Sequence, residues 1–164
     1  KGKVSTEVES TFEVDLQIDA YIPDSYIKDG HQKIEMYKRF RALKTMDELN
    51  ELQEEMIDRF GDYPEQVHYL FLISEMKIHA QQSNLESIKQ DKHQVTILMT
   101  EEGSKQVDGE KVVKICNKYG RMVGFGMEED KLKITLNTQK VSMEKWFHVA
   151  FEIIKQLKGA IKSK

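Results

Sequence analysis

One helix of this chain has sequence signals at both of its ends, which sets its length. Thr45 is followed three residues later by Glu48, and this pair forms a capping box in which the side chains satisfy free backbone N–H groups. Gly61 tolerates the left-handed conformation that ends many helices, and Pro64 favours the first turn of a following helix. We therefore predict a helix over residues 46–60 that is followed directly by another.

This predicted helix has an acidic side and an apolar side. Six of its residues are acidic and only Arg59 is basic. Four of the acidic residues recur at intervals of three, four and three, which places them on one ridge; they are Glu48, Glu51, Glu55 and Asp58. Like charges at such spacings oppose a helix by about 0.2–0.5 kcal/mol per pair. We interpret this costly acidic ridge as a docking surface for a cationic partner.

A basic helix is predicted just before the acidic one, over residues 31–44. Apolar residues recur there at helical spacing among five basic ones, which are Lys33, Lys38, Arg39, Arg41 and Lys44. Two simpler explanations of the acidic ridge therefore stay open: it is an ordinary solvated surface, or it pairs with this basic helix inside the same domain. The basic helix also supports an alternative function, that of an accessory nucleic-acid-binding module.

The remaining patterns alternate between strand and helix. In chain order we predict a strand within residues 12–20, helices over 31–44, 46–60 and 64–83, strands over 85–89 and 95–99, a helix over 107–119, a hairpin over 122–136 and a final helix after Ser142. This order, β-α-α-α-β-β-α-β-β-α, predicts an α+β fold in which an N-terminal strand and three-helix half packs on a small antiparallel sheet with two further helices. Residues 1–10 are polar and are expected to form a linker or tail, so residues 11–164 are expected to be a single domain.

Composition limits the possible functions. The formal net charge of −3 gives no general attraction to nucleic acids or anionic membranes, and no apolar run approaches the roughly 20 residues of a membrane-spanning helix. The only cysteine, Cys116, has no internal disulfide partner, which fits a reducing cytoplasm. The chain starts without Met or a signal peptide, so we expect a cytoplasmic fragment of a larger protein that is monomeric as an isolated domain.

Sequence motifs for catalysis and cofactor binding are missing from the chain. It has no glycine-rich P-loop, no G-x-S-x-G, no C-x-x-C and no H-E-x-x-H. The histidines are not spaced as metal ligands, and the G-x-G formed by Gly124 and Gly126 does not follow a strand-to-helix turn. We therefore expect a non-catalytic domain that binds no cofactor and no metal.

Four stretches between Val14 and about Leu85 form a distinctive combination. They are Ala20-Tyr-Ile-Pro-Asp-Ser-Tyr-Ile27, Lys33-Ile-Glu-Met-Tyr-Lys-Arg-Phe40, Thr45-Met-Asp-Glu-Leu49 and Ile57-Asp-Arg-Phe-Gly61 followed by Pro64. In this combination the chain resembles the C-terminal (TRCF) domain of bacterial transcription-repair-coupling factors, the Mfd-type DNA translocases. Residues 86–164 are similar to that family only in their arrangement, with a variable region, a hairpin and a long terminal helix.

The resemblance implies a regulatory domain of a DNA-repair protein. In that family the full protein recognises RNA polymerase stalled at DNA damage, displaces it with an ATP-driven translocase and recruits UvrA, and its motor domains lie outside this chain. The C-terminal domain is an autoinhibitory clamp that docks on the UvrB-like N-terminal domain of the same protein and masks its UvrA-binding surface.

The same resemblance assigns residues to the docking contact. In the family, acidic residues of the E-x-x-D-R-F-G segment face arginines of the N-terminal domain, and the matching positions here are Glu55 and Asp58. Glu51, Arg59 and Glu48 are the second choices. The resemblance thus selects the same acidic ridge as the charge pattern.

Overall fold

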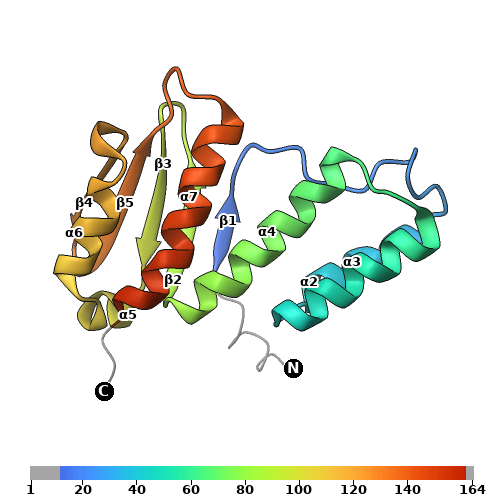
Figure 1. Ribbon diagram of the computed structural model, residues 1–164, viewed down its shortest axis with the longest axis horizontal. Helices are drawn as coiled ribbons and strands as arrows, with labels where there is room; N and C mark the ends of the chain where they lie inside the picture. Colours follow the sequence, from blue (N-terminus) through green and yellow to red (C-terminus); the bar gives the residue numbers. More distant parts are fainter. Residues whose placement is uncertain (1–11, 162–164) are drawn as a thin grey trace. The chain divides into compact units, whose positions relative to one another are not determined.

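The computed structural model describes residues 12–161, which form an α+β fold (Figure 1). The elements in chain order are β1 (Glu13–Asp15), α2 (Gly30–Ala42), α3 (Met46–Phe60), α4 (Glu65–Gln82), β2 (Leu85–Gln90), β3 (Gln94–Met99), α5 (Glu101–Gln106), α6 (Gly109–Asn117), the short helix η1 (Gly120–Met122), β4 (Val123–Glu128), β5 (Lys131–Asn137), α7 (Met143–Leu157) and the short helix η2 (Lys158–Ala160). The predicted α+β class is therefore confirmed.

The chain divides into two compact units. Ile18–Ile78 form the helical unit, and the segments before and after it form the sheet unit. The tail predicted over residues 1–10 lies outside the described residues. The single domain predicted over residues 11–164 stays a prediction.

The helical unit contains α2, α3 and most of α4 around an apolar core. Its core residues are Ile22, Ile27, Met36, Phe40, Leu49, Leu52, Met56, Val67, Phe71 and Ile78. Tyr37 Oη accepts a hydrogen bond from Ile22 N at 2.7 Å, and Tyr26 Oη donates one to Gly61 O at 2.7 Å. These two tyrosines therefore tie the loop before α2 to the helices.

Both predicted ends of α3 are confirmed. Thr45 Oγ1 accepts a hydrogen bond from Glu48 N at 3.1 Å, and the Glu48 carboxylate accepts one from Lys44 N at 2.8 Å. The reciprocal bond thus reaches one residue further back than in the usual capping box. Gly61 follows the helix with a φ of +87°, a conformation that favours glycine.

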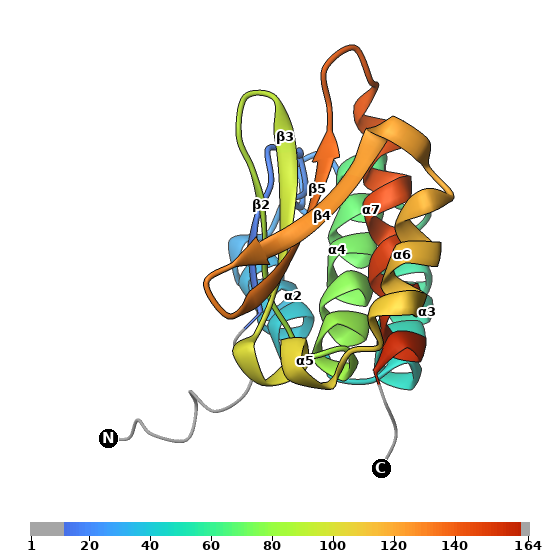
Figure 2. The ribbon, with the colours of Figure 1, turned by 90° about the vertical axis from the view of Figure 1, so that its left-hand side faces the viewer.

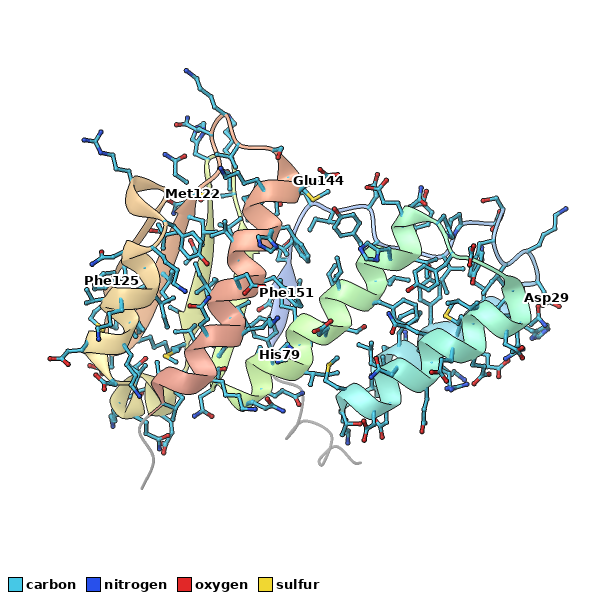
Figure 3. All side chains as sticks on the ribbon, viewed as in Figure 1. Asp29, His79, Met122, Phe125, Glu144 and Phe151 are labelled. Carbon is cyan, nitrogen blue, oxygen red and sulfur yellow. The ribbon has the colours of Figure 1, made fainter. Side chains whose placement is uncertain are left out.

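The sheet unit is a five-stranded sheet with α6 and α7 together on one face (Figure 2). Its strand order is β1-β2-β3-β5-β4, and neighbouring strands are antiparallel except β1 and β2, which are parallel. The most deeply buried strand residues are Ile88, Val95, Ile97, Met99, Ile134 and Leu136. Phe151 of α7 lies 6.1 Å from His79, measured between ring centroids (Figure 3). The buried strand residues form an apolar face of the sheet, and its burial against α7 forms the core of the unit.

Two elements differ from their predicted extent. β1 covers only three residues, because its pairing with β2 is limited to Ser87–Lys89. The helix expected over residues 107–119 is present as α6, but it is preceded by α5, which the pattern did not predict. The six residues of α5 lack apolar periodicity, and the helix begins because Thr100 Oγ1 accepts a hydrogen bond from Gly103 N at 2.9 Å.

Replacing Trp146 with alanine should destabilise the chain strongly. Trp146 is 3% exposed in the first turn of α7, and its ring lies 6.3 Å from that of Phe147. Removing a fully buried aromatic side chain costs about 3–5 kcal/mol. We expect a matching fall in the free energy of unfolding measured with urea, whereas Glu144→Ala on the exposed side of the same turn should change it by less than about 1 kcal/mol. Equal stabilities of the two variants would contradict this placement of the indole.

Replacing Gly103 with alanine should also destabilise the chain, although alanine normally favours a helix. A Cβ atom at this position would lie 2.6 Å from Asn84 Cβ and 2.8 Å from Asn84 O. Such overpacking costs about 1–3 kcal/mol and outweighs the helix preference. Gly109→Ala is the matched control, because nothing lies within 4 Å of its added Cβ. Thermal unfolding should show a lower midpoint for the first variant only.

Candidate functional site

The centre of the predicted docking segment is an ion-pair network between α2 and α3. Glu55 Oε1 lies 2.9 Å from Arg39 Nη2, and Glu55 Oε2 lies 3.0 Å from Arg59 Nη1. Arg59 Nη1 also lies 3.8 Å from Glu35 Oε2. The hydrogen bond from Arg39, followed by that from Arg59, lowers the pKa of Glu55 below its usual 4.5. Glu55 therefore faces arginines of its own unit.

This network confirms one of the two simpler explanations for one residue of the acidic ridge. Pairing with the basic helix inside the domain was one of the alternatives left open, and Arg39 of α2 provides it for Glu55. Glu48 is engaged as well, since its carboxylate caps the N-terminus of α3 through Lys44 N. The remaining ridge residues, Glu51 and Asp58, are exposed.

Four exposed acidic positions of α3, two of which are the ridge residues Glu51 and Asp58, lie on the side of the helix opposite its buried residues. They recur at intervals of four, three and four and are Asp47, Glu51, Glu54 and Asp58, which we call the acidic row. All four side chains are exposed, and within residues 12–161 none of them has an ion pair or a hydrogen bond from its carboxylate. Ile57 lies beside this row and is 46% exposed. A cationic surface with a shallow apolar contact fits such a row.

The spacing analysis missed Asp47, Glu54 and Ile57. On a helix, spacings of three and four connect each residue to two adjacent rows, so the spacing of the acidic residues alone does not say which row is outermost. The apolar residues Leu49 and Met56 would have been the signal, because the row opposite them is the one furthest from the core.

Some basic side chains of α2 form ion pairs with carboxylates of their own unit. Arg39 pairs with Glu55, and Lys33 pairs with Asp24. Arg59 is also occupied, since its guanidinium lies 5.0 Å from the ring centroid of Phe60 in addition to its ion pairs. Fewer cations are thus left for phosphate groups, which weakens the nucleic-acid alternative.

Two features bear on metal binding and on the single thiol. No group of three His, Cys, Asp or Glu side chains among residues 12–161 is placed to hold a metal ion. Cys116 is buried, and burial raises its pKa to about 11, so its thiol is a poor nucleophile. None of the described helices has the length and apolar character needed to cross a membrane.

Comparison with known proteins identifies the family. The protein-family model described as the TRCF domain matches residues 16–110 of this chain. The chain is 48% identical over 162 residues to the transcription-repair-coupling factor of Bacillus subtilis (strain 168), which is 99% of this chain and 14% of that protein. This chain belongs to the transcription-repair-coupling factor family.

Further similarities agree with membership of this family. The transcription-repair-coupling factor of Staphylococcus aureus (strain USA300) is 38% identical over 127 residues, which is 77% of this chain and 11% of that protein. A crystal structure of the C-terminal domain of a transcription-repair coupling factor superposes with a TM-score of 0.83 at 27% identity, covering 93% of this chain and 94% of that one. By the match given above, the TRCF chain spans about one seventh of the length of the B. subtilis relative.

Glu55→Gln should destabilise the TRCF chain in a pH-dependent way. Because the folded pKa of Glu55 is lowered, its ion pairs stabilise the fold above pH 4.5, and this contribution is lost as the pH falls further. Partly exposed pairs contribute about 1 kcal/mol or less, so urea unfolding at pH 7 should show a loss of that size. At pH 3.5 the difference from the parent should shrink. Glu54→Gln, which removes an unpaired carboxylate one residue away, should have little effect, and a Glu55→Gln difference that persists unchanged in acid would contradict the network.

Proposed function

We propose that this TRCF domain is a non-catalytic regulatory domain of an ATP-dependent DNA translocase that acts in transcription-coupled nucleotide excision repair. It works as an autoinhibitory clamp that docks on the UvrB-like N-terminal domain of its own protein and masks the UvrA-binding surface there. RNA polymerase, UvrA and DNA are partners of the parent protein, which acts in the cytoplasm. The TRCF domain contributes the docking surface and no chemical step.

The unpaired acidic row is the observation that carries this proposal. Four exposed carboxylates on one side of α3 repel each other, and within residues 12–161 none of them forms a direct ion pair, although Glu51 interacts electrostatically with Arg39. Arginines of a docking partner would relieve that repulsion with charge-assisted hydrogen bonds, which are shorter and stronger than neutral ones. Ile57 adds an apolar contact of the kind found at the centre of protein interfaces.

Glu55 and Asp58 remain the proposed contact residues, with different contributions. Asp58 lies in the acidic row and is free to meet a partner arginine directly. Glu55 keeps 34% of its side chain exposed while it is bound by Arg39 and Arg59. It therefore holds Arg39 and Arg59 in place beside the acidic row, and Glu51 extends the contact along the row.

The alternative function, a nucleic-acid-binding module on α2, is disfavoured by the ion pairs of its basic residues. Lys33 and Arg39 are both engaged with carboxylates of the helical unit. The adjacent acidic row would also repel phosphate groups at low ionic strength. Binding of duplex DNA by the isolated domain with a steep dependence on salt would favour this alternative.

Reversing the charge of the acidic row should open the clamp in the full-length protein. Glu51→Lys together with Asp58→Lys would place lysines opposite the partner arginines, and such like-charge contacts cost several kcal/mol. We therefore expect UvrA binding without stalled polymerase to rise by about tenfold or more at low salt. The measurement is the UvrA affinity of the full-length parent and of the double variant.

Two controls keep this experiment interpretable. In the isolated domain the same pair should leave the unfolding free energy unchanged or slightly raised, because neither carboxylate has an ion pair to lose. Glu110→Lys with Glu144→Lys makes the same charge change on exposed positions of the sheet unit and should leave UvrA binding as it was. Equal UvrA affinities for parent and row variant, with both proteins folded, would rule out the acidic row as the clamp contact.

A further inference from the structure

A groove lies on the sheet unit between α6 and the C-terminal end of α7. The two helices run side by side in both views of the ribbon (Figures 1 and 2), and the groove between them has a volume of about 440 Å³. Four lysines line it: Lys111 and Lys114 from α6, Lys118 directly after the end of α6, and Lys155 from α7. We call this feature the lysine groove. Among the described residues 12–161, its lining contains no carboxylate and no aromatic ring.

The positive charge of the lysine groove is almost uncompensated. Lys111 Nζ donates to the backbone oxygen of Gly159 at 3.3 Å, and Lys118 Nζ donates to Gln156 Oε1 at 2.9 Å, so both ammonium groups meet neutral acceptors. Lys155 Nζ lies 3.7 Å from a carboxylate oxygen of Glu152. In a chain whose acidic residues outnumber its basic ones by 28 to 25, this grouping is not the result of a general excess of lysine.

The lysines recur at the same three- and four-residue intervals as the carboxylates of α3, but they carry the opposite charge. Lys111, Lys114 and Lys118 are three and four residues apart and therefore share one side of α6 and of its C-cap, where like charges oppose the helix. An anionic partner seated between the two helices would turn this repulsion into attraction. The partner would also contact the long aliphatic stems of the lysines.

The floor of the lysine groove is apolar. Ile115 and Ala160 lie between the lysines and are 8% and 1% exposed, respectively. A ligand that fills the groove therefore needs an apolar group as well as negative charge. Single-stranded nucleic acid is a poor fit, because its bases stack on aromatic side chains and none lines the groove. Lysine ammonium groups are compact positive charges that can donate hydrogen bonds to carboxylates approaching from many directions.

We propose that the lysine groove binds an acidic protein segment that inserts an apolar side chain between α6 and α7. The apolar side chain lies on Ile115 and Ala160, while flanking Asp or Glu carboxylates meet Lys114, Lys118 and Lys155. This surface is on a different unit from the acidic row and serves a second protein partner. The inference does not depend on the autoinhibitory contact.

The test uses the whole 164-residue chain and a blocked synthetic peptide of sequence Asp-Glu-Leu-Leu-Glu-Asp. Titration followed by ¹⁵N NMR should shift the amide signals of α6 and of the end of α7. Lys114→Glu with Lys118→Glu should weaken peptide binding by at least tenfold, whereas Lys92→Glu with Lys145→Glu, an equal charge change at exposed positions elsewhere, should not. A peptide with serine in place of leucine should bind more weakly than the parent peptide. Should the charge-reversed pair unfold, Lys114→Gln with Lys118→Gln is the substitute and should weaken binding several-fold.

Four results would overturn the proposal. The first is no binding of the peptide at low salt, and the second is equal binding by the groove variant and the parent. The third is binding of tripolyphosphate or a thymidine dodecamer at the groove as tightly as the peptide, which would assign the groove to phosphate groups. The fourth is concentration-dependent self-association that Lys114→Glu with Lys118→Glu abolishes, because the groove would then hold a second copy of this chain.

Discussion

Burial of one apolar side of α3 determines where every charge of that helix lies. Leu49, Leu52 and Met56 are at most 2% exposed. With 100° between successive residues, this burial directs Glu55 towards α2 and leaves the acidic row in solvent. Rotating α3 so that Glu55 faced solvent and the acidic row faced α2 would expose large apolar side chains. Burial of each such side chain stabilises the fold by about 1.5–3 kcal/mol. The ion pairs to Arg39 and Arg59 follow from this packing, since partly exposed pairs are too weak to direct it.

Both units of the TRCF chain carry a one-sided charged helix whose charges lack matching partners. In α3 the unpaired charges are carboxylates beside the exposed Ile57, and in α6 they are ammonium groups beside Ile115. Each arrangement opposes its own helix, and the charges nearly cancel over the chain as a whole. Such local separation with an apolar neighbour suits recognition of other proteins, in which complementary charge selects the partner and adjacent apolar groups add affinity. It fits the regulatory docking role that we propose for this domain.

Local signals explain why much of the fold was predictable. Thr45, Glu48 and Gly61 act within one helical turn of the ends of α3, and these ends agree with the prediction. The hairpin of β4 and β5 likewise forms around a two-residue turn, in which Glu129 has a φ of +58°. By contrast, α5 depends on Thr100, whose hydroxyl also donates to Asn84 O at 3.1 Å, sixteen residues away along the chain. The parallel pairing of β1 with β2 is similarly non-local, and no periodicity encodes it.

The sequence by itself determined the family, the α+β class, the presence of an acid-rich helix and the residues that begin and end it. Spacings of three and four describe neighbours on a helix surface, however, and they leave open which of two adjacent rows faces solvent. Only the tertiary structure decided that Glu55 is bound by Arg39 of another helix, while Asp47, Glu51, Glu54 and Asp58 stay open to a partner. The lysine groove likewise required the fold, because α6 and Lys155 are far apart in the sequence and become neighbours only when both helices pack on the same face of the sheet.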